Sequence, residues 1–147
     1  MNDEKTILTE INSQFGLEKV ELRTYSPLAL AFIGDSLYDV VVKTVIVERG
    51  NCQVNKLQNR TAQIVKAVTQ AKLYDYLKDG HISEEEEAVM RRGRNEKPYT
   101  KAKNASYGEY CKATGLEALV GYLFLKNETQ RLVELIKLGI EKAGLEI

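Results

Sequence analysis

The sequence predicts an all-α protein, a helical bundle, and three observations support this prediction. Apolar residues recur at helical spacing over long segments, capping residues come before these segments, and glycines follow them. The β-branched run at residues 40–47 continues an apolar register that begins at Leu28, so we assign it to a helix rather than to a strand. Residues 1–147, of which 44% are apolar, suit one domain with a core of its own.

Helices in the first half of the chain are marked by their ends. A short helix is expected over residues 3–14. A serine followed by proline starts the next one, over residues 27–49, because the missing N–H of proline costs nothing there, and Gly50 offers a left-handed stop. One amphipathic helix is then expected from about residue 54 to residue 77, with Gly80 after it.

Two capping boxes start helices in the second half. Residues 83–86 read Ser-Glu-Glu-Glu, and the glutamates fall in a first helical turn, where the helix dipole favours them without any binding partner. Residues 106–109 form the second box and open a helix that is expected to end at Leu125. A last amphipathic helix is expected over residues 128–142, with Gly144 as its stop.

The composition excludes several classes of protein. No segment approaches about 18 uninterrupted apolar residues and the N-terminus lacks a secretion signal, so we expect no membrane contact and a cytoplasmic location. Cys52 and Cys111 stand in no paired motif and are expected to be free thiols. With His81 as the only histidine, neither a closed zinc site nor a Ser-His-Asp or Cys-His enzyme is favoured.

Charge is balanced overall but segregated along the chain. The 21 basic and 21 acidic side chains cancel, which argues against binding nucleic acid by bulk charge. Residues 91–103 nevertheless hold six basic side chains against the single acid Glu96. Such an excess can contact phosphates, and a solvated loop with incidental charge explains it equally well.

Carboxylates within apolar helices are the candidate chemical groups. Asp35 and Asp39 lie one turn apart in the apolar helix 27–49, and Lys43 can pair with Asp39 on a solvated stripe but leaves Asp35 unexplained. Glu117 is the one charge in the apolar run 114–125. Two such carboxylates could supply a Mg²⁺ site, since Mg²⁺ prefers a few carboxylate oxygens and keeps several waters. Such a site could activate water and stabilise charge on a phosphate.

Two segments resemble motifs of a known family. Residues 32–37, Phe-Ile-Gly-Asp-Ser-Leu, resemble the signature helix of the ribonuclease III family, whose pattern ends in Phe-Leu-Gly-Asp. Residues 117–121, Glu-Ala-Leu-Val-Gly, resemble its second motif, Glu-Ala-Leu-Ile-Gly. Residues 91–95, Arg-Arg-Gly-Arg-Asn, and residues 103–106, Lys-Asn-Ala-Ser, resemble the Mini-ribonuclease III branch, which consists of the catalytic domain alone. Each motif alone is weak, but together and in this order they are specific.

The resemblance covers about residues 18–143 and implies a ribonuclease III endonuclease domain that forms a homodimer. The 22 residues after Leu125 are too few for a double-stranded-RNA-binding domain. The implied activity is Mg²⁺-dependent cleavage of double-stranded RNA, giving 5′-phosphate and 3′-hydroxyl ends. For this branch the implied task is maturation of the 5′ and 3′ ends of the 23S ribosomal RNA precursor.

The resemblance also implies roles for particular residues. Asp35 falls on the catalytic aspartate and Glu117 on the catalytic, metal-binding glutamate, so both are expected to hold Mg²⁺. Without a separate RNA-binding domain, the catalytic domain must grip the duplex, which is read by shape and by phosphate and 2′-hydroxyl contacts. The expected contacts lie in a mobile loop around the proline at position 98, and the candidates are Arg91, Arg92, Arg94, Asn95 and Lys97.

Three departures from the family pattern keep an alternative open. Larger members have glutamates at the positions of Leu28 and Ala31 and an aspartate at that of Thr114, so weaker metal binding is expected here. The alternative is a catalytically inactive ribonuclease III-like module for RNA binding or dimerisation. Asp39 is expected to be either solvated or an indirect neighbour of the site. A ribosomal protein that presents the substrate is a further, speculative partner.

Overall fold

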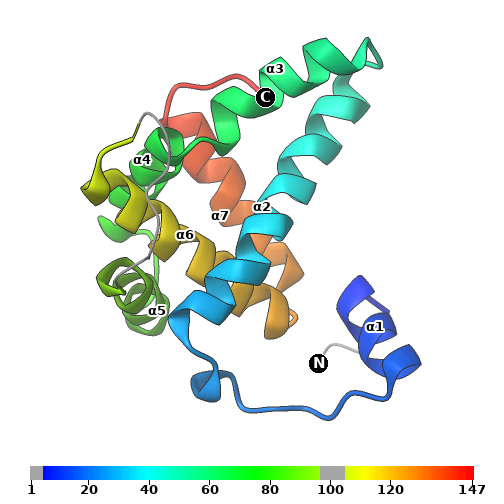
Figure 1. Ribbon diagram of the computed structural model, residues 1–147, viewed down its shortest axis with the longest axis vertical. Coiled ribbons are helices and arrows are strands. Elements are labelled where there is room, and N and C mark those ends of the chain that lie inside the picture. The colour runs from blue at the N-terminus through cyan, green and yellow to red at the C-terminus, as the bar shows by residue number, and fades with distance from the viewer. Residues whose placement is uncertain (1–4, 97–104) are drawn as a thin grey trace.

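Seven α-helices and one short 3-10 helix make up the part of the chain that the computed structural model describes, residues 5–96 and 105–147. These residues contain no strand, which confirms the predicted all-α class (Figure 1). The elements are α1 (Ile7–Phe15), η1 (Leu22–Thr24), α2 (Pro27–Arg49), α3 (Val54–Val65), α4 (Ala67–Lys78), α5 (Glu84–Asn95), α6 (Tyr107–Leu125) and α7 (Thr129–Lys142).

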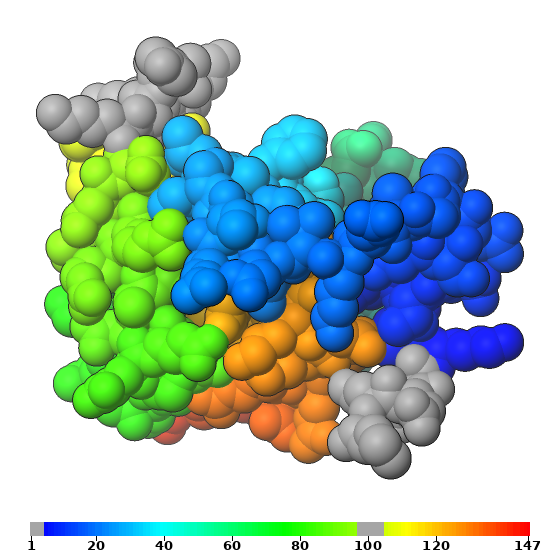
Figure 2. All heavy atoms as spheres, turned by 90° about the horizontal axis from the view of Figure 1, so that it is seen from below, coloured from blue at the N-terminus to red at the C-terminus, as the bar shows by residue number. Residues whose placement is uncertain are grey.

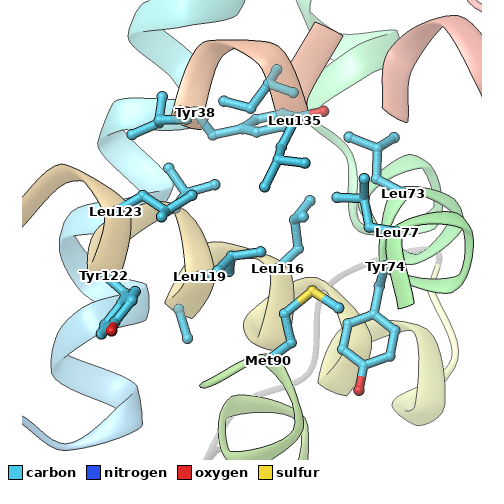
Figure 3. Packing of buried hydrophobic residues seen from close by; sticks show 14 of the residues in the cluster. Tyr38, Leu73, Tyr74, Leu77, Met90, Leu116, Leu119, Tyr122, Leu123 and Leu135 are labelled. Carbon is cyan, nitrogen blue, oxygen red and sulfur yellow. The ribbon is translucent and has the colours of Figure 1, made fainter. Parts of the chain in front are cut away.

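The helix α6 lies at the centre of the bundle. It packs against α2, α4, α5 and α7, and its largest interface is with α2. Its leucines at positions 116, 119 and 123 are buried among side chains of the surrounding helices, including Tyr38 of α2, Tyr74 of α4, Met90 of α5 and Leu135 of α7 (Figure 3). The absence of an amphipathic pattern in this helix therefore follows from contacts on nearly all sides.

The predicted starts of α2, α5 and α6 are confirmed. The hydroxyl of Ser26 accepts a hydrogen bond from the backbone N–H of Ala29, and proline stands first in α2. Both predicted capping boxes form, at the starts of α5 and α6. Glu109, for example, accepts from the N–H of Ser106 at 2.9 Å while its own N–H donates to the serine hydroxyl at 3.1 Å. Local sequence thus fixes where the core helices begin.

The prediction of a single helix over residues 54–77 is wrong, because this segment forms two helices, α3 and α4. Lys66 is extended at the junction, with φ −67° and ψ 153°. Two carbonyls left open by the break find side-chain donors: the Thr69 hydroxyl donates to Gln63 at 2.7 Å, and the Tyr38 hydroxyl of α2 donates to Ile64 at 3.0 Å. A contact from a distant helix therefore stabilises the break, and a local pattern does not contain it.

Smaller boundary differences have local causes. The helix expected over residues 3–14 begins after the capping residue Thr6, and η1 was not predicted. Gly50 has φ 171°, which is extended, so the expected left-handed stop is wrong there. Gly80 and Gly144 do adopt left-handed conformations after α4 and α7.

The helix α1 lies at the edge of the bundle (Figure 1). In Figure 2, α1 and α5 lie at opposite sides of the molecule. The helix α1 is anchored by the buried Leu8 and by a 2.8 Å hydrogen bond from the Thr6 hydroxyl to Asn127. Ile7 and Phe15 remain exposed. Among the described helices, none has the length and apolar character that a membrane crossing requires.

Candidate active site

The closest approach of two helices in the site region is the crossing of α2 and α6 at two glycines. A Cβ atom on Gly34 would overlap the backbone carbonyl of Glu117, and one on Gly121 would overlap the carbonyl of Leu30. Gly34 belongs to the motif at residues 32–37 and Gly121 to the motif at residues 117–121. Glycine is required at both positions because the opposite backbone occupies the space of a side chain. The crossing places one motif directly on the other.

This crossing brings the two predicted site residues together. Asp35 follows Gly34 and Glu117 lies across from it, and the two carboxyl groups are close enough for Asp35 to raise the pKa of Glu117 by hydrogen bonding and by charge. Asp35 is exposed and Glu117 is half-buried, so the pair spans the boundary between core and solvent. Two carboxyl groups so close, with one reaching solvent, can share a cation or a proton.

The electrostatics of Glu117 reflect its position. Burial, followed by the hydrogen bond and negative charge of Asp35, raises the pKa of the Glu117 carboxyl to about 9. A side-chain hydrogen bond from Gln70 acts in the opposite direction, and the charge of Asp39 raises the pKa further. Without a cation, Glu117 is therefore held in its protonated form at neutral pH. A bound divalent cation would favour the charged carboxylate and so act against this shift.

Asp39 lies one turn after Asp35 and forms the predicted pair with Lys43, at 3.7 Å. It is half-buried, and burial raises the pKa of its carboxyl, partly offset by Lys43. Its negative charge contributes to the raised pKa of Glu117. Asp39 thus has the solvated partner that the sequence suggested and also influences the candidate site.

The positions that depart from the family pattern contribute no acid. Leu28 is half-buried, Ala31 is buried, and the buried Thr114 hydroxyl donates to the carbonyl of Tyr110 at 3.0 Å. Within residues 5–96 and 105–147, no group of three or more histidine, cysteine or acidic side chains is arranged to hold a metal ion. The donor set of the described chain is therefore the pair Asp35 and Glu117.

The basic candidates for RNA contact lie on α5 rather than in a loop. Arg91, Arg92, Arg94 and Asn95 belong to its last turns, where the helix dipole favours basic residues, so the predicted loop is wrong for these four. Lys97 lies outside the described residues. Arg91 pairs with a glutamate one turn earlier at 3.3 Å, and the Arg94 guanidinium donates to the Asn95 side chain. The close contact of Gly93 with Ala118 sets this basic turn beside α6.

A hollow of about 550 Å³ lies where η1, α2, α5 and α6 meet. Arg92 lines it together with Arg23 and Lys126, two basic residues that the sequence did not single out. Acids compensate both of these, since Arg23 pairs with Glu21 at 2.7 Å and Lys126 with Glu85 at 3.5 Å. Within the described chain no such pair forms at Arg92.

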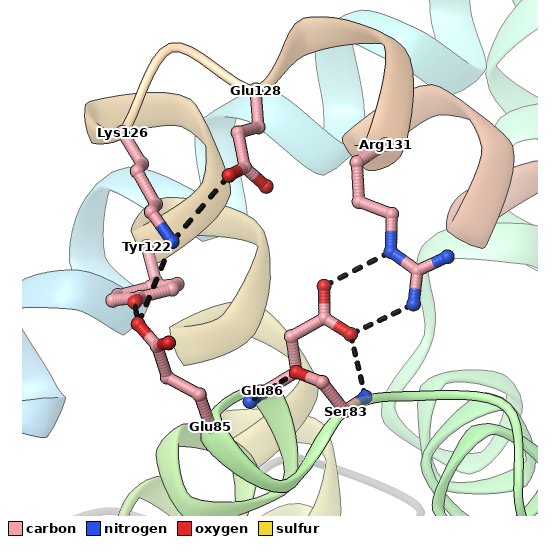
Figure 4. Close-up of polar contacts among 7 residues, drawn as sticks. All are labelled: Ser83, Glu85, Glu86, Tyr122, Lys126, Glu128 and Arg131. Carbon is pink, nitrogen blue, oxygen red and sulfur yellow. Dashed lines mark hydrogen bonds and ion pairs between the residues drawn. The ribbon is translucent and has the colours of Figure 1, made fainter.

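The acidic start of α5 does have partners, contrary to the expectation that it needs none (Figure 4). Glu85 accepts from the Tyr122 hydroxyl and pairs with Lys126. Glu86, which closes the capping box, also accepts two hydrogen bonds from the guanidinium of Arg131, at 2.9 and 2.8 Å. These contacts tie α5 to α6 and α7.

Sequence analysis also missed Gln70, the buried glutamine that contacts Glu117. A signal was present: Gln70 lies three and seven residues before Leu73 and Leu77, so it occupies the apolar side of its helix. A polar residue at such a position requires a hydrogen-bond partner.

Comparisons with known proteins identify the family of this chain. A family model described as the Ribonuclease III domain matches residues 28–128, which contain both motifs and the basic turn of α5. The chain therefore belongs to the ribonuclease III family, and its activity is that of an endoribonuclease.

Curated relatives narrow the family to Mini-ribonuclease 3, as the sequence motifs predicted. The Mini-ribonuclease 3 of Clostridium tetani is 44% identical over 123 residues, which cover 83% of this chain and 81% of the relative. That of Thermoanaerobacter sp. is 40% identical over 142 residues, covering 94% and 96%. A crystal structure of protein FN1578 from Fusobacterium nucleatum matches with a TM-score of 0.73 and 25% identity, over 82% of this chain and 96% of that one.

Proposed function

We propose that the protein is a Mg²⁺-dependent endoribonuclease that cleaves double-stranded RNA, with Asp35 and Glu117 as its catalytic and metal-binding residues. The observation that carries the proposal is the close pair of carboxyl groups at the glycine crossing of α2 and α6. The family match supports it, since both residues fall within the matched segment. The ends produced would be a 5′-phosphate and a 3′-hydroxyl.

The carboxyl pair fits a hard divalent cation. Carboxylate oxygens are the ligands that Mg²⁺ prefers, and the remaining positions go to water and to substrate phosphate oxygens. When bound, Mg²⁺ lowers the pKa of a coordinated water and stabilises the charge that develops on the phosphate. The half-buried Glu117 and the exposed Asp35 would hold the cation at the edge of the core, within reach of a duplex backbone.

We propose that the basic turn of α5 binds the RNA backbone. Arg91 and Arg92 are exposed and can reach phosphates, and Arg94 and Asn95 present donors beside them. Lys97 remains a candidate from the sequence alone. Because double-stranded RNA is recognised through phosphates and 2′-hydroxyls, donors of this kind supply the contacts that binding needs.

We further propose that two copies of the chain associate through the outer face of α2. Phe32 is 82% exposed, and Val40 and Val47 on the same face of this helix are exposed as well. Large apolar side chains on a surface indicate a contact with another protein, and a two-fold axis would present the same face on both subunits. Phe32 lies three residues before Asp35, so such a dimer would set its two sites near each other.

For the biological substrate we propose the precursor of 23S ribosomal RNA, cut near both ends of the mature molecule in the cytoplasm. This proposal rests on the sequence resemblance to the Mini-ribonuclease III branch and on the relatives of that name. A ribosomal protein that presents the RNA is a possible partner. The alternative, an inactive RNA-binding or dimerisation module, is favoured by one observation: Leu28, Ala31 and Thr114 supply no carboxylate.

Cleavage of a long RNA duplex in Mg²⁺ by the parent, Asp35→Asn and Asp75→Asn tests the proposal. Asp75 is an exposed aspartate of α4 that pairs with Lys112, so it is a control of the same size and charge change. We expect the parent and Asp75→Asn to cut, and Asp35→Asn to bind RNA without cutting. Equal cutting by all three would contradict the assignment of Asp35. RNA binding without cutting by the parent, on the duplex and on the ribosomal precursor, would favour the inactive module.

A further inference from the structure

Gln70 is a buried side chain in the first turn of α4 that faces the candidate site. Only 2% of its surface is exposed, and its backbone N–H is used within the helix, donating to Lys66 at 3.1 Å. Its side-chain amide lies close enough to the carboxyl of Glu117 to lower the pKa of that group. This direction favours the charged carboxylate, as expected when the amide nitrogen faces it. Throughout the described residues, no buried polar side-chain atom lacks a hydrogen-bond partner.

The break between α3 and α4 directs Gln70 toward Glu117. The break depends on hydroxyl donors at its carbonyls, Thr69 for Gln63 and Tyr38 for Ile64. Tyr38 lies on α2, three residues after Asp35, so the helix that carries one carboxylate also holds the end of α3, just before the helix that carries the glutamine. A continuous helix over this segment would give α4 another direction and withdraw the amide from the site.

We propose that Gln70 is a positioning residue for the metal site, which holds the Glu117 carboxylate in the orientation that binds a divalent cation. The inference rests on the proposed function of Glu117. A neutral donor suits this position, because an acid would add a third negative charge beside Asp35 and Glu117, and a cation would compete with the metal. A bond to one carboxylate oxygen fixes the side chain and leaves the other oxygen to the metal.

Direct binding of Mn²⁺ to the full-length protein, measured by electron paramagnetic resonance without RNA, tests the inference. Gln70→Met keeps the approximate volume and removes the donor. We expect it to weaken Mn²⁺ binding by about 10- to 100-fold, the usual effect of losing a hydrogen bond to a metal ligand. We expect RNA binding in the absence of metal to stay within about two-fold, and higher Mg²⁺ to restore part of the cleavage rate.

Thr61→Val is the matched control, because Thr61 is also buried but its hydroxyl bonds a backbone carbonyl within α3, away from the break. It should leave Mn²⁺ binding within about two-fold. If Gln70→Met does not fold, Gln70→Leu takes its place. Parent-like Mn²⁺ affinity in a folded Gln70 variant, or an equal loss in Thr61→Val, would overturn the inference.

Two further variants separate this inference from the proposed function. Asp35→Asn and Glu117→Gln should each abolish or greatly weaken Mn²⁺ binding. If they do and the Gln70 variant binds like the parent, only the positioning role is wrong. If neither of them weakens binding, the metal site itself is wrong, and the role of Gln70 with it.

Discussion

At the scale of single residues, the candidate site leaves no room for a side chain at Gly34. Gly34→Ala would place a methyl group on the backbone of Glu117, so the helices α2 and α6 would have to separate. We expect a loss of about 1–3 kcal/mol or more of unfolding free energy, and loss of cleavage even in the folded fraction. Urea unfolding and cleavage assays at matched folded concentrations measure both effects.

Gly108→Ala provides the control for this prediction. Gly108 also lies in a helix, α6, but a Cβ there would meet only the Ser106 hydroxyl, at 4.0 Å. Alanine should therefore stabilise the protein by about 0.4–1 kcal/mol, through a less flexible unfolded chain. A similar loss in both variants would mean that the crossing is not the cause.

The raised pKa of Glu117 predicts that this residue lowers the unfolding free energy of the metal-free protein at neutral and higher pH. Because the folded-state pKa, about 9, lies above the ordinary 4.5, the folded state binds the proton more tightly. Unfolding free energy should therefore fall as pH rises between these two values. In a chelator, Glu117→Gln should be more stable than the parent at pH 8 and differ little at pH 5. The prediction would be contradicted if the melting temperatures of Glu117→Gln and the parent differed by the same amount at every pH in this range. Glu84→Gln, which changes an exposed glutamate, is the control.

At the scale of elements, the start of α5 carries a measurable ionic contact. The guanidinium of Arg131, through its hydrogen bonds to the carboxylate, holds the pKa of Glu86 below its ordinary 4.5. The stabilisation is thus full above about pH 4.5 and is lost as pH falls through the lowered value. Glu86→Gln keeps the capping box, since glutamine can also accept from Ser83.

We expect Glu86→Gln to lose about 1–2 kcal/mol at pH 7 and less as the pH is lowered from 6 to 3. Denaturant unfolding at several pH values measures this difference. If the difference between variant and parent did not change with pH, the contact would contribute by shape rather than by charge.

The sequence predicted that most of the helices exist, but it did not predict where a helix is interrupted. The capping boxes at Ser83 and Ser106 are local, so four-residue patterns located them. The break at Lys66 depends on the Tyr38 hydroxyl, which arrives from 26 residues away and leaves no local pattern. The contact of Gln70 with Glu117 was missed for the same reason. Asp35 and Glu117 were singled out because charges are costly in apolar helices and because they fall in the family motifs, and their catalytic role stays a prediction.

At the scale of the whole molecule, the exposed face of α2 predicts a dimer. Phe32→Glu should convert dimers to monomers in analytical ultracentrifugation, because it places two like charges at the proposed two-fold contact. Val133→Glu on α7 is the control, since Val133 is also exposed, at 42%, but lies on another helix. Dimers that resist Phe32→Glu and dissociate with Val133→Glu would relocate the interface.

The basic turn of α5 predicts a salt-dependent contact with RNA. Arg91→Ala and Arg94→Ala should each raise KM and reduce the slope of log binding constant against log salt by about one. Lys137→Ala is the control, because Lys137 is an exposed lysine of α7 whose partner is Glu141. An unchanged salt slope in both arginine variants would exclude phosphate contacts from this turn.

The glycine crossing of α2 and α6 ties the candidate site to global unfolding. The two carboxyl groups stand on backbones that touch in the core, so no lid or hinge movement separates them while the bundle is intact. Backbone amides near Gly34 and Gly121 should therefore exchange with deuterium only when the entire chain unfolds. An inhibitor or regulator of this enzyme could then act by covering the carboxylates, whereas separating the two carboxyl groups would require the protein to unfold.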